Sequence, residues 1–132
     1  MSSATVHTWS ELATDYPMER IDRQRIVGER MMISRVTLHP GFRIPSHHHE
    51  NEQMVVMLSG RARFLVGPVG GEASEEVTLE GGQVLELPSN VPHACEALER
   101  CEILDLFSPV SEGTGVDARE PHQPGTGSPG MN

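Results

Sequence analysis

The segment PGFRIPSHHHENEQMVVMLSG, residues 40–60, decides how this chain is interpreted. It holds three consecutive histidines, followed by an apolar run at residues 53–58 that ends at Ser-Gly, a turn signal. In an extended strand, residues of equal parity share a face, so His47, His49 and Gln53 are predicted to point to the same side. Two imidazoles two residues apart start from Cα atoms roughly 6.6 Å apart, which lets both bind one metal ion. The segment therefore predicts a metal site on a strand.

A third ligand must come from elsewhere in the chain. His93 follows a turn rich in Gly, Pro and Asn, and it is the only other histidine of the strand-rich region besides His39. Glu50 or Glu52 could replace Gln53 as a ligand only if a bulge reversed the parity of the strand. A site of three histidines without a fourth protein ligand also fits the pattern.

The residues around this segment follow the two-residue period of β-strands. Alternating or short apolar runs, separated by Gly, Pro and Asn, occur at residues 30–39, 53–58, 61–66, 75–80, 83–87 and 101–107. Short strands at this spacing, with almost no helical pattern, are typical of an all-β sandwich or barrel. A single turn of helix or an edge strand is expected at residues 9–12.

Composition divides the 132 residues into three regions. Residues 1–28 are expected to form an N-terminal arm or edge strand, and residues 29–110 the barrel. Residues 111–132 are so rich in Gly, Pro and Ser that burial of apolar area cannot offset the entropy of ordering, which predicts a disordered tail. Because exposed sheet edges are commonly covered by a second copy, a homodimer is expected.

The charge balance excludes several classes of partner. The chain has 19 acidic residues against 10 arginines and no lysine, giving a net charge of −9. Such a surface repels nucleic-acid phosphates and anionic lipids, so neither nucleic acid nor membrane is an expected partner. There is no long apolar run or signal-peptide pattern, which predicts a cytoplasmic protein. Cys95 and Cys101 fit no disulfide framework or CxxC motif and are expected to be small buried hydrophobes.

The motif spacing resembles that of the cupin superfamily, in its small, single-domain bacterial form. The first motif, G(x)5HxH(x)3E(x)6G, is matched by Gly41, His47, His49, Gln53 and Gly60, and the second, G(x)5PxG(x)2H(x)3N, by Gly82, Pro88, Asn90 and His93. The resemblance implies an RmlC-like jelly-roll β-barrel of two antiparallel sheets. It also implies that one divalent transition metal ion is bound by His47, His49, Gln53 and His93. Imidazole ligands accept Fe, Ni, Zn, Mn, Co or Cu, so the identity of the metal stays open.

Three positions depart from the family pattern. Gln53 stands where the family usually has Glu, Asn90 replaces a Gly, and Ala97 replaces a terminal Asn that is not a ligand. Asn is tolerable at position 90 if that position needs a positive φ, because Asn visits the left-handed region more readily than most residues. With Gln53, an all-neutral ligand set leaves the ion its full +2 charge, which favours an anionic ligand such as a carboxylate or enolate.

A second polar feature lies on the predicted last strand, CEILDLF, residues 101–107. Asp105 shares a face with Cys101, Ile103 and Phe107, and the cupin resemblance places this strand along the barrel lining. A partly desolvated carboxylate near a divalent ion can act as general acid or base, so Asp105 is the predicted catalytic residue. The alternative is that Asp105 faces a turn or pairs with an arginine.

The segments at residues 52–67 and 104–109 resemble the KdgF-like cupins, which open 4,5-unsaturated uronate sugars. This resemblance implies a His/His/Gln/His metal site and an Asp-x-Phe pair, matched by Asp105 and by Phe107 as a substrate-binding residue. The Arg that usually follows Phe-x-Pro in that subgroup is absent, since Val110 and Ser111 come next. Arg63 or Arg61 could instead bind a substrate carboxylate, unless both are solvated.

Three functions are compatible with these features. The first is a metal-dependent enzyme acting on a small anionic substrate, an isomerase or lyase such as a uronate ring-opening enzyme, in which Asp105 transfers protons. The second is an Fe, Ni or Cu dioxygenase of a small organic substrate. The third is a binding or sensing module that uses the metal without turnover.

Overall fold

The computed structural model describes residues 3–110, so the predicted tail at residues 111–132 lies outside the described residues. Within this range the chain forms one short 3₁₀ turn and nine strands. These elements are η1 (Trp9–Glu11), β1 (Ile21–Val27), β2 (Met32–Leu38), β3 (Arg43–His47), β4 (Glu52–Ser59), β5 (Arg61–Val66), β6 (Glu75–Glu80), β7 (Val84–Leu87), β8 (His93–Ala97) and β9 (Cys101–Ser108). No helix of residues 3–110 has the length and apolar character needed to cross a membrane.

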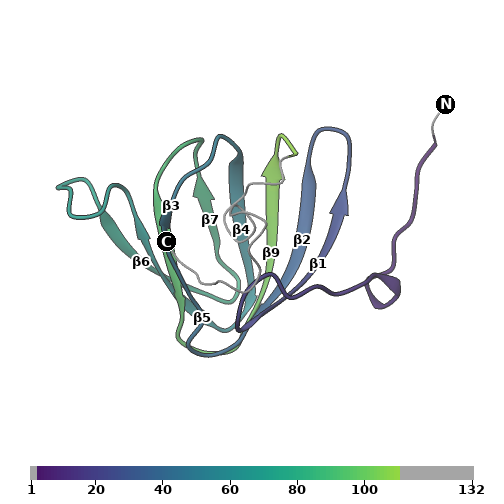
Figure 1. Cartoon of the computed structure of the whole chain (residues 1–132), viewed down its shortest axis with the longest axis horizontal. Coiled ribbons are helices and arrows are strands. Elements are labelled where there is room, and N and C mark those ends of the chain that lie inside the picture. The colour runs from purple at the N-terminus through teal and green to yellow at the C-terminus, as the bar shows by residue number, and fades with distance from the viewer. Residues whose placement is uncertain (1–2, 111–132) are drawn as a thin grey trace.

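The strands form two antiparallel sheets that face each other (Figure 1). One sheet has the order β1-β2-β9-β4-β7 and the other the order β3-β8-β5-β6. Apart from the consecutive pairs β1–β2 and β5–β6, neighbouring strands are far apart in sequence, as in the pairing of β2 with β9. This is the jelly-roll architecture that the sequence predicts.

The core lies between the two sheets and is formed by the inward residues of the alternating strands. On β2, every second residue from Met32 to Leu38 is buried, and on β5 the buried residues are Ala62 and Phe64. Gly60 is required between β4 and β5 because it has φ +93° and a Cβ atom there would lie 2.2 Å from the carbonyl oxygen of Arg100. Tight turns of this kind let short strands follow one another without helices.

The histidine-rich segment is not one continuous strand. β3 ends at His47 and β4 begins at Glu52, and the two strands belong to different sheets. The expectation that strand parity alone aligns His47, His49 and Gln53 is therefore wrong. The chain crosses from one sheet to the other between these residues, and His49 lies in the connecting loop.

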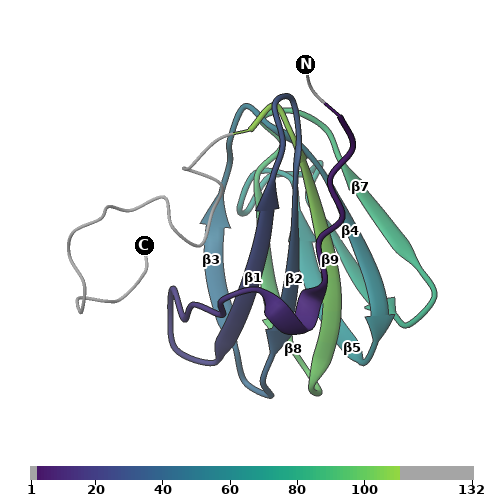
Figure 2. The ribbon, with the colours of Figure 1, turned by 90° about the vertical axis from the view of Figure 1, so that its right-hand side faces the viewer.

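Residues 1–28, expected to form an arm or edge strand, contain β1, which pairs with β2 along its whole length at the edge of the sheet. Two other strands differ from the sequence expectation. Residues 43–46 of β3 and the whole of β8 were not expected to be strands, because β3 contains Pro45 and residues 94–100 have too few apolar positions to show a pattern. The chain before β1 crosses the outer side of β1 and β2 (Figure 2), where the side-chain amide of Gln24 donates to the carbonyls of Trp9 and Leu12 at 2.7 and 3.0 Å.

Candidate metal centre

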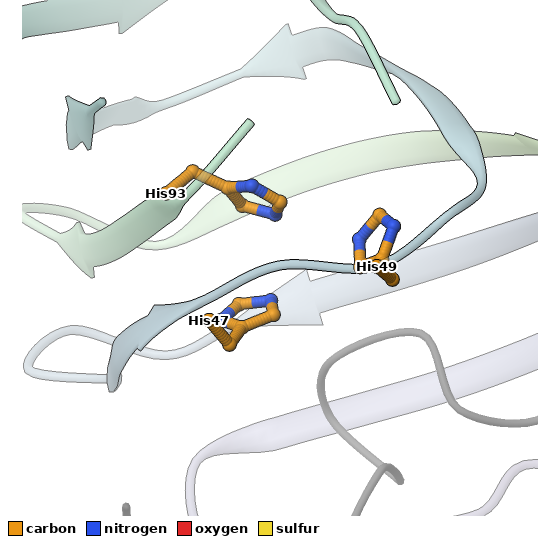
Figure 3. Close-up of side chains that lie close together, drawn as sticks. All are labelled: His47, His49 and His93. Carbon is orange, nitrogen blue, oxygen red and sulfur yellow. The ribbon is translucent and has the colours of Figure 1, made fainter. Parts of the chain in front are cut away.

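Three histidines from different parts of the chain converge between the sheets (Figure 3). His47 ends β3, His93 begins β8, and His49 lies in the loop that leads to β4. The ring centroids are 4.4 to 5.8 Å apart, and one ligand nitrogen from each ring lies within 4.8 Å of the others. Their side chains are therefore close enough to hold a single ion, which makes this group the candidate metal centre.

Each imidazole is oriented by a backbone carbonyl. The Nδ1 atoms of His47, His49 and His93 lie 2.9, 3.1 and 2.9 Å from the carbonyl oxygens of residues 45, 51 and 91. A carbonyl oxygen only accepts, so each Nδ1 carries the proton and Nε2 is the nitrogen with a lone pair. Such bonds are the usual way in which proteins orient metal-binding histidines.

The buried state of these rings also favours their neutral form. Burial lowers the pKa of His93 to about 4, against the bond to the Val91 carbonyl, which raises it. Burial likewise lowers the pKa of His49. Since only a neutral imidazole binds a metal ion, both rings are in the ligand state at neutral pH.

The loop position of His49 depends on a residue of the second cupin motif. The backbone N–H of Asn90 donates to the His49 carbonyl at 2.8 Å, and Asn90 has φ +66°. Asn tolerates this left-handed conformation, which explains how it can occupy a position where cupins usually have Gly.

Gln53 and Asp105 form a polar pair on the inner face of the five-stranded sheet. The Gln53 side-chain amide on β4 donates to Asp105 Oδ1 on the neighbouring β9 at 3.0 Å. This bond uses the NH₂ end of the amide and leaves its carbonyl oxygen as the ligand-type atom. Burial raises the pKa of Asp105 to about 6, although the bond from Gln53 lowers it. Asp105 therefore has an acidity suited to proton transfer near neutral pH.

This pair also changes the electrostatic expectation for the site. A neutral Gln53 alone would leave a bound ion its full charge. The ionised Asp105, bonded to the Gln53 amide, adds a negative charge close to the site and so lowers its net positive charge.

The two alternatives to Gln53 as a ligand, Glu50 and Glu52, both have exposed side chains.

A cavity between the sheets joins the histidines to this pair. The space between its walls is about 630 Å³, a figure that includes space open to solvent. Its polar lining consists of Arg23, Ser34, His47, Gln53, His93, Cys95 and Asp105, and its apolar lining includes Phe107. Asp105 and Phe107 therefore share the cavity with two of the three histidines.

Burial raises the pKa of the Cys95 thiol far above its usual value, so Cys95 is a protonated lining group and not a nucleophile.

Arg63 does not reach this cavity. It alternates with the inward residues Ala62 and Phe64, so its side chain is exposed on the outside of β5, where it pairs with Glu96 and Glu76. The arginine that does line the cavity is Arg23, which was missed because residues 1–28 were expected to form an arm or edge strand outside the barrel. Residues 22–25 are all polar, so no alternation in the sequence shows which face of this strand is buried.

Comparison with known proteins agrees with this architecture. A family model described as the cupin domain matches residues 34–107. The chain belongs to the cupin family. This cupin is similar in fold to KdgF from Halomonas sp., with 21% identity and a TM-score of 0.74 over 83% of this chain and 97% of that one. A search of curated protein sequences returned no match.

Two further solved cupins have the same fold. An RmlC-like cupin from Shewanella frigidimarina has 18% identity and a TM-score of 0.73 over 83% of this chain and 95% of that one. Oxalate decarboxylase from Bacillus subtilis has 22% identity and a TM-score of 0.71 over 85% of this chain. The present cupin spans only 32% of the length of that decarboxylase chain.

The residues of this cupin fit a transition-metal ion. Among buried side-chain nitrogen and oxygen atoms of residues 3–110, only His49 Nε2 has no hydrogen-bond partner. A buried polar atom without a partner costs free energy, and a metal ion bound to this lone pair would remove that cost. The donor set, three imidazole nitrogens with the Gln53 side chain in the lining of the same cavity, is of the kind that Fe, Ni, Zn, Mn, Co and Cu accept.

Proposed function

We propose that this cupin is a metal-dependent enzyme of the isomerase or lyase type that acts on a small anionic organic substrate. His47, His49, His93 and Gln53 would hold one divalent transition-metal ion. The single observation that carries the proposal is the convergence of three imidazoles, each with Nδ1 bonded to a backbone carbonyl, beside the Gln53–Asp105 pair.

The chemistry follows from the groups that face the cavity. When bound, a divalent ion supplies Lewis acidity toward an oxygen atom of the substrate. Asp105 takes or returns a proton at its carboxylate, and Gln53 fixes the orientation of that carboxylate. Phe107 contributes an apolar wall that packs against the substrate and lies near His49, with ring centroids 5.9 Å apart.

Ring opening of an unsaturated uronate is the reaction we propose first. The likeness to KdgF in fold and the Asp-x-Phe pair at Asp105 and Phe107 support it. A uronate is a carboxylate, so it suits the cationic centre proposed here. Because the Arg that usually follows this pair in the KdgF-like subgroup is absent, the substrate screen should include other small carboxylates and diketones.

The proposal is tested by metal analysis and one substitution. Protein expressed without added metal is expected to contain about one equivalent of a transition metal per chain. Manganese belongs in the elemental screen because Bacillus subtilis oxalate decarboxylase has Mn(II) centres. Asp105→Asn is expected to lower turnover by about 10²- to 10⁴-fold while retaining the metal. Glu102→Gln is the matched control, because it changes a carboxylate on the outward side of the same strand.

Each alternative function has a distinct outcome. Consumption of oxygen during turnover would identify a dioxygenase, and tight binding of carboxylates without any turnover would identify a binding module. Wild-type turnover rates in Asp105→Asn would remove Asp105 from proton transfer. Purified protein without stoichiometric metal would falsify the metal-dependent function as a whole.

The proposed homodimer is supported by the outer face of the five-stranded sheet. Cross-strand rows of apolar residues run over it, and one of them joins Ile26, Ile33, Leu106 and Met54. Met54, Leu58 and Val84 on this face are 37%, 48% and 55% exposed. A C2 dimer that packs two such faces against each other would remove this apolar area from water.

A further inference from the structure

Ser34 is a buried serine in the cavity wall that the proposed reaction does not use. It lies on β2, its side chain is only 2% exposed, and it lines the cavity between the sheets. The other inward residues of β2 are apolar, namely Met32, Val36 and Leu38. A hydroxyl group among such neighbours costs free energy unless it has a hydrogen-bond partner, so its presence needs an explanation.

The Ser34 hydroxyl has no hydrogen-bond partner within residues 3–110. It differs in this from Ser108 on β9, whose Oγ donates to the carbonyl of Arg30 at 2.9 Å. It differs also from His49 Nε2, which is fully enclosed by protein, because Ser34 Oγ borders the space of the cavity. A buried hydroxyl that faces a cavity and bonds to no neighbour is available to a ligand.

Asp105 lies directly opposite Ser34 on the neighbouring strand. β2 and β9 are antiparallel, and Ser34 pairs with Asp105 in their register. Partners of this kind have Cβ atoms about 4.5–5.5 Å apart on the same face of the sheet. The hydrogen bond to Asp105 comes instead from Gln53 on β4, the strand on the other side of β9. Asp105 therefore has the Gln53 amide on one side and the Ser34 hydroxyl on the other.

The hydrogen-bonding capacities of Ser34 and Asp105 are complementary to those of an alcohol. Gln53 donates to Oδ1 of Asp105, and no residue of 3–110 donates to Oδ2. A carboxylate only accepts, whereas a serine hydroxyl can donate. Two groups about 5 Å apart can both reach one ligand oxygen at ordinary hydrogen-bond distances of about 2.8 Å. A ligand hydroxyl in this position accepts from Ser34 and donates to Asp105, which neither an ether nor a methyl group can do.

The distance from Ser34 to the candidate metal centre limits the size of such a ligand. Gln53 on β4 is two strand spacings from Ser34 in the order β2-β9-β4, and their registers on β9 differ by two residues. The two Cα atoms are therefore roughly 12 Å apart. Because both side chains reach into the cavity, the gap that remains between them is of a length that a chain of about three or four carbon atoms spans.

We propose that Ser34 is a specificity-determining residue that binds a hydroxyl group of the substrate jointly with Asp105. This inference rests on the proposed metal-dependent function and names its substrate class: small acids with a hydroxyl about three or four carbons from the group held at the metal centre. Ser34 donates to the hydroxyl oxygen, and the hydroxyl donates to Asp105 Oδ2. When the substrate O–H bond breaks, the proton passes to Oδ2, and the hydrogen bond from Ser34 stabilises the electron pair left on the oxygen.

The test is a double-mutant cycle between one atom of the protein and one group of the ligand. Full-length metal-loaded protein is titrated calorimetrically with 4-hydroxybutanoate and with pentanoate, in which a methyl group replaces the hydroxyl. The pair 5-hydroxypentanoate and hexanoate extends the comparison by one carbon. In Ser34→Ala, the ratio of the two dissociation constants is expected to shift by about fivefold or more towards the acid without a hydroxyl, the size of one neutral hydrogen bond.

A matched control and a stability measurement distinguish binding from a merely structural role. Ser108→Ala removes the same atom from a serine that does not line the cavity, so it should leave the ratio unchanged. Ser34→Ala is expected to keep or raise the urea midpoint of unfolding, because the hydroxyl it removes has no partner within residues 3–110. A Ser34→Ala protein with a lowered midpoint and an unchanged ratio would show that Ser34 is structural, which overturns the inference. Should Ser34→Ala fail to fold, Ser34→Cys replaces it, with an expected shift of at least about threefold because a thiol is a weak donor.

The remaining outcomes separate this inference from the proposed function. Metal-loaded protein whose ratio is the same with and without the Ser34 hydroxyl overturns the inference and leaves the metal function intact. Metal-loaded protein that binds neither pair of acids overturns the substrate class. Tighter binding of 4-methoxybutanoate than of 4-hydroxybutanoate overturns the assignment to a hydroxyl, because the ether has no proton to donate to Asp105. If the wild-type protein holds no metal, the proposed function fails, and the same cycle on metal-free protein decides by its ratio whether Ser34 binds a hydroxyl.

Discussion

The two faces of the five-stranded sheet each contain exceptions to the usual pattern of apolar residues inside and polar residues outside. The inner face, which is packed against the second sheet, carries Gln53, Asp105, Ser34 and Arg23 among its apolar residues. The outer face carries an apolar row that includes Ile33, Leu106 and Met54. Burial of polar groups costs free energy, and exposed apolar area is not stabilising, so both faces depart from what stability alone would select.

On the inner face, hydrogen bonds offset the cost of burying polar side chains. Gln53 is bonded to Asp105, and Arg23 to Asp15, so these buried polar side chains are paired. Within residues 3–110, the segment before β1 covers the outer face only near Gln24 and Arg35. The apolar row that includes Met54 has exposed side chains. The inner exceptions are explained by the proposed ligand site and the outer ones by the proposed dimer. The predictions below test these two proposals separately.

The largest effect is expected within the histidine segment itself. His49→Ala removes a buried imidazole whose Nε2 faces the site, and His48→Ala removes the exposed neighbour. If about a quarter of a binding free energy of roughly 10–16 kcal/mol comes from one of four ligands, His49→Ala weakens metal binding by about 100- to 1000-fold. His48→Ala should bind metal like the wild-type protein. Competition with a chelator measures both affinities, and equal losses in the two variants would contradict the site.

The next effect concerns the outer face. Met54→Lys combined with Leu106→Lys places two positive charges in the apolar row and is expected to raise the dimer dissociation constant by at least about tenfold. Metal affinity should not change, because neither residue lines the cavity. Analytical ultracentrifugation measures the association. A wild-type protein that is monomeric at all concentrations would contradict the dimer, without bearing on the inner face.

The difference between the faces also explains which parts of the fold the sequence could predict. Residues 61–66 and 75–80 were predicted with the bounds that β5 and β6 have, because each run shows clear alternation and ends at glycines. β1 was not predicted as part of the barrel, because its inward residues include Arg23 as well as Ile21. Alternation gives a period of two but does not say which face is buried when both faces carry polar residues.

The candidate site was predictable where motif spacing carries the information. The two cupin motifs predict the four candidate ligands, His47, His49, Gln53 and His93. The prediction that a single strand aligns three of them was wrong, because β3 ends at His47 and β4 begins at Glu52. The structure holds these residues together with a change of sheet and with the loop bond from Asn90 to His49. Arg23 and Asp15 have no motif, and their pairing depends on how the chain before β1 returns to the edge of the sheet.

A smaller effect is expected when the same methylene group is removed from the core and from the outer face. Ile103→Val on the inner face and Ile33→Val on the outer face delete the same methylene group. Ile103 is 2% exposed, so its loss is expected to cost about 0.5–1.5 kcal/mol, whereas Ile33→Val in the monomeric variant should cost less than about 0.5 kcal/mol. Urea unfolding measures both differences. Equal costs would mean that the outer face is packed as tightly as the core.

The smallest effect is a pH dependence at the edge where the two faces meet. Burial raises the pKa of Asp15, but the hydrogen bond and charge of Arg23, with the charge of Arg25, outweigh it and hold the pKa below its usual value of 3.8. A lowered folded-state pKa contributes stability above about pH 3.8, and that contribution is lost as the pH falls through the folded-state value. Since the Asp15 side chain is 48% exposed, the contribution is expected to be less than about 1 kcal/mol. The difference in urea unfolding between wild-type protein and Asp15→Asn should therefore be smaller at pH 2 than at pH 6. A difference that persists undiminished at pH 2 would show that Asp15 stabilises the edge of the sheet through its backbone bridge to Arg23 and not through its charge.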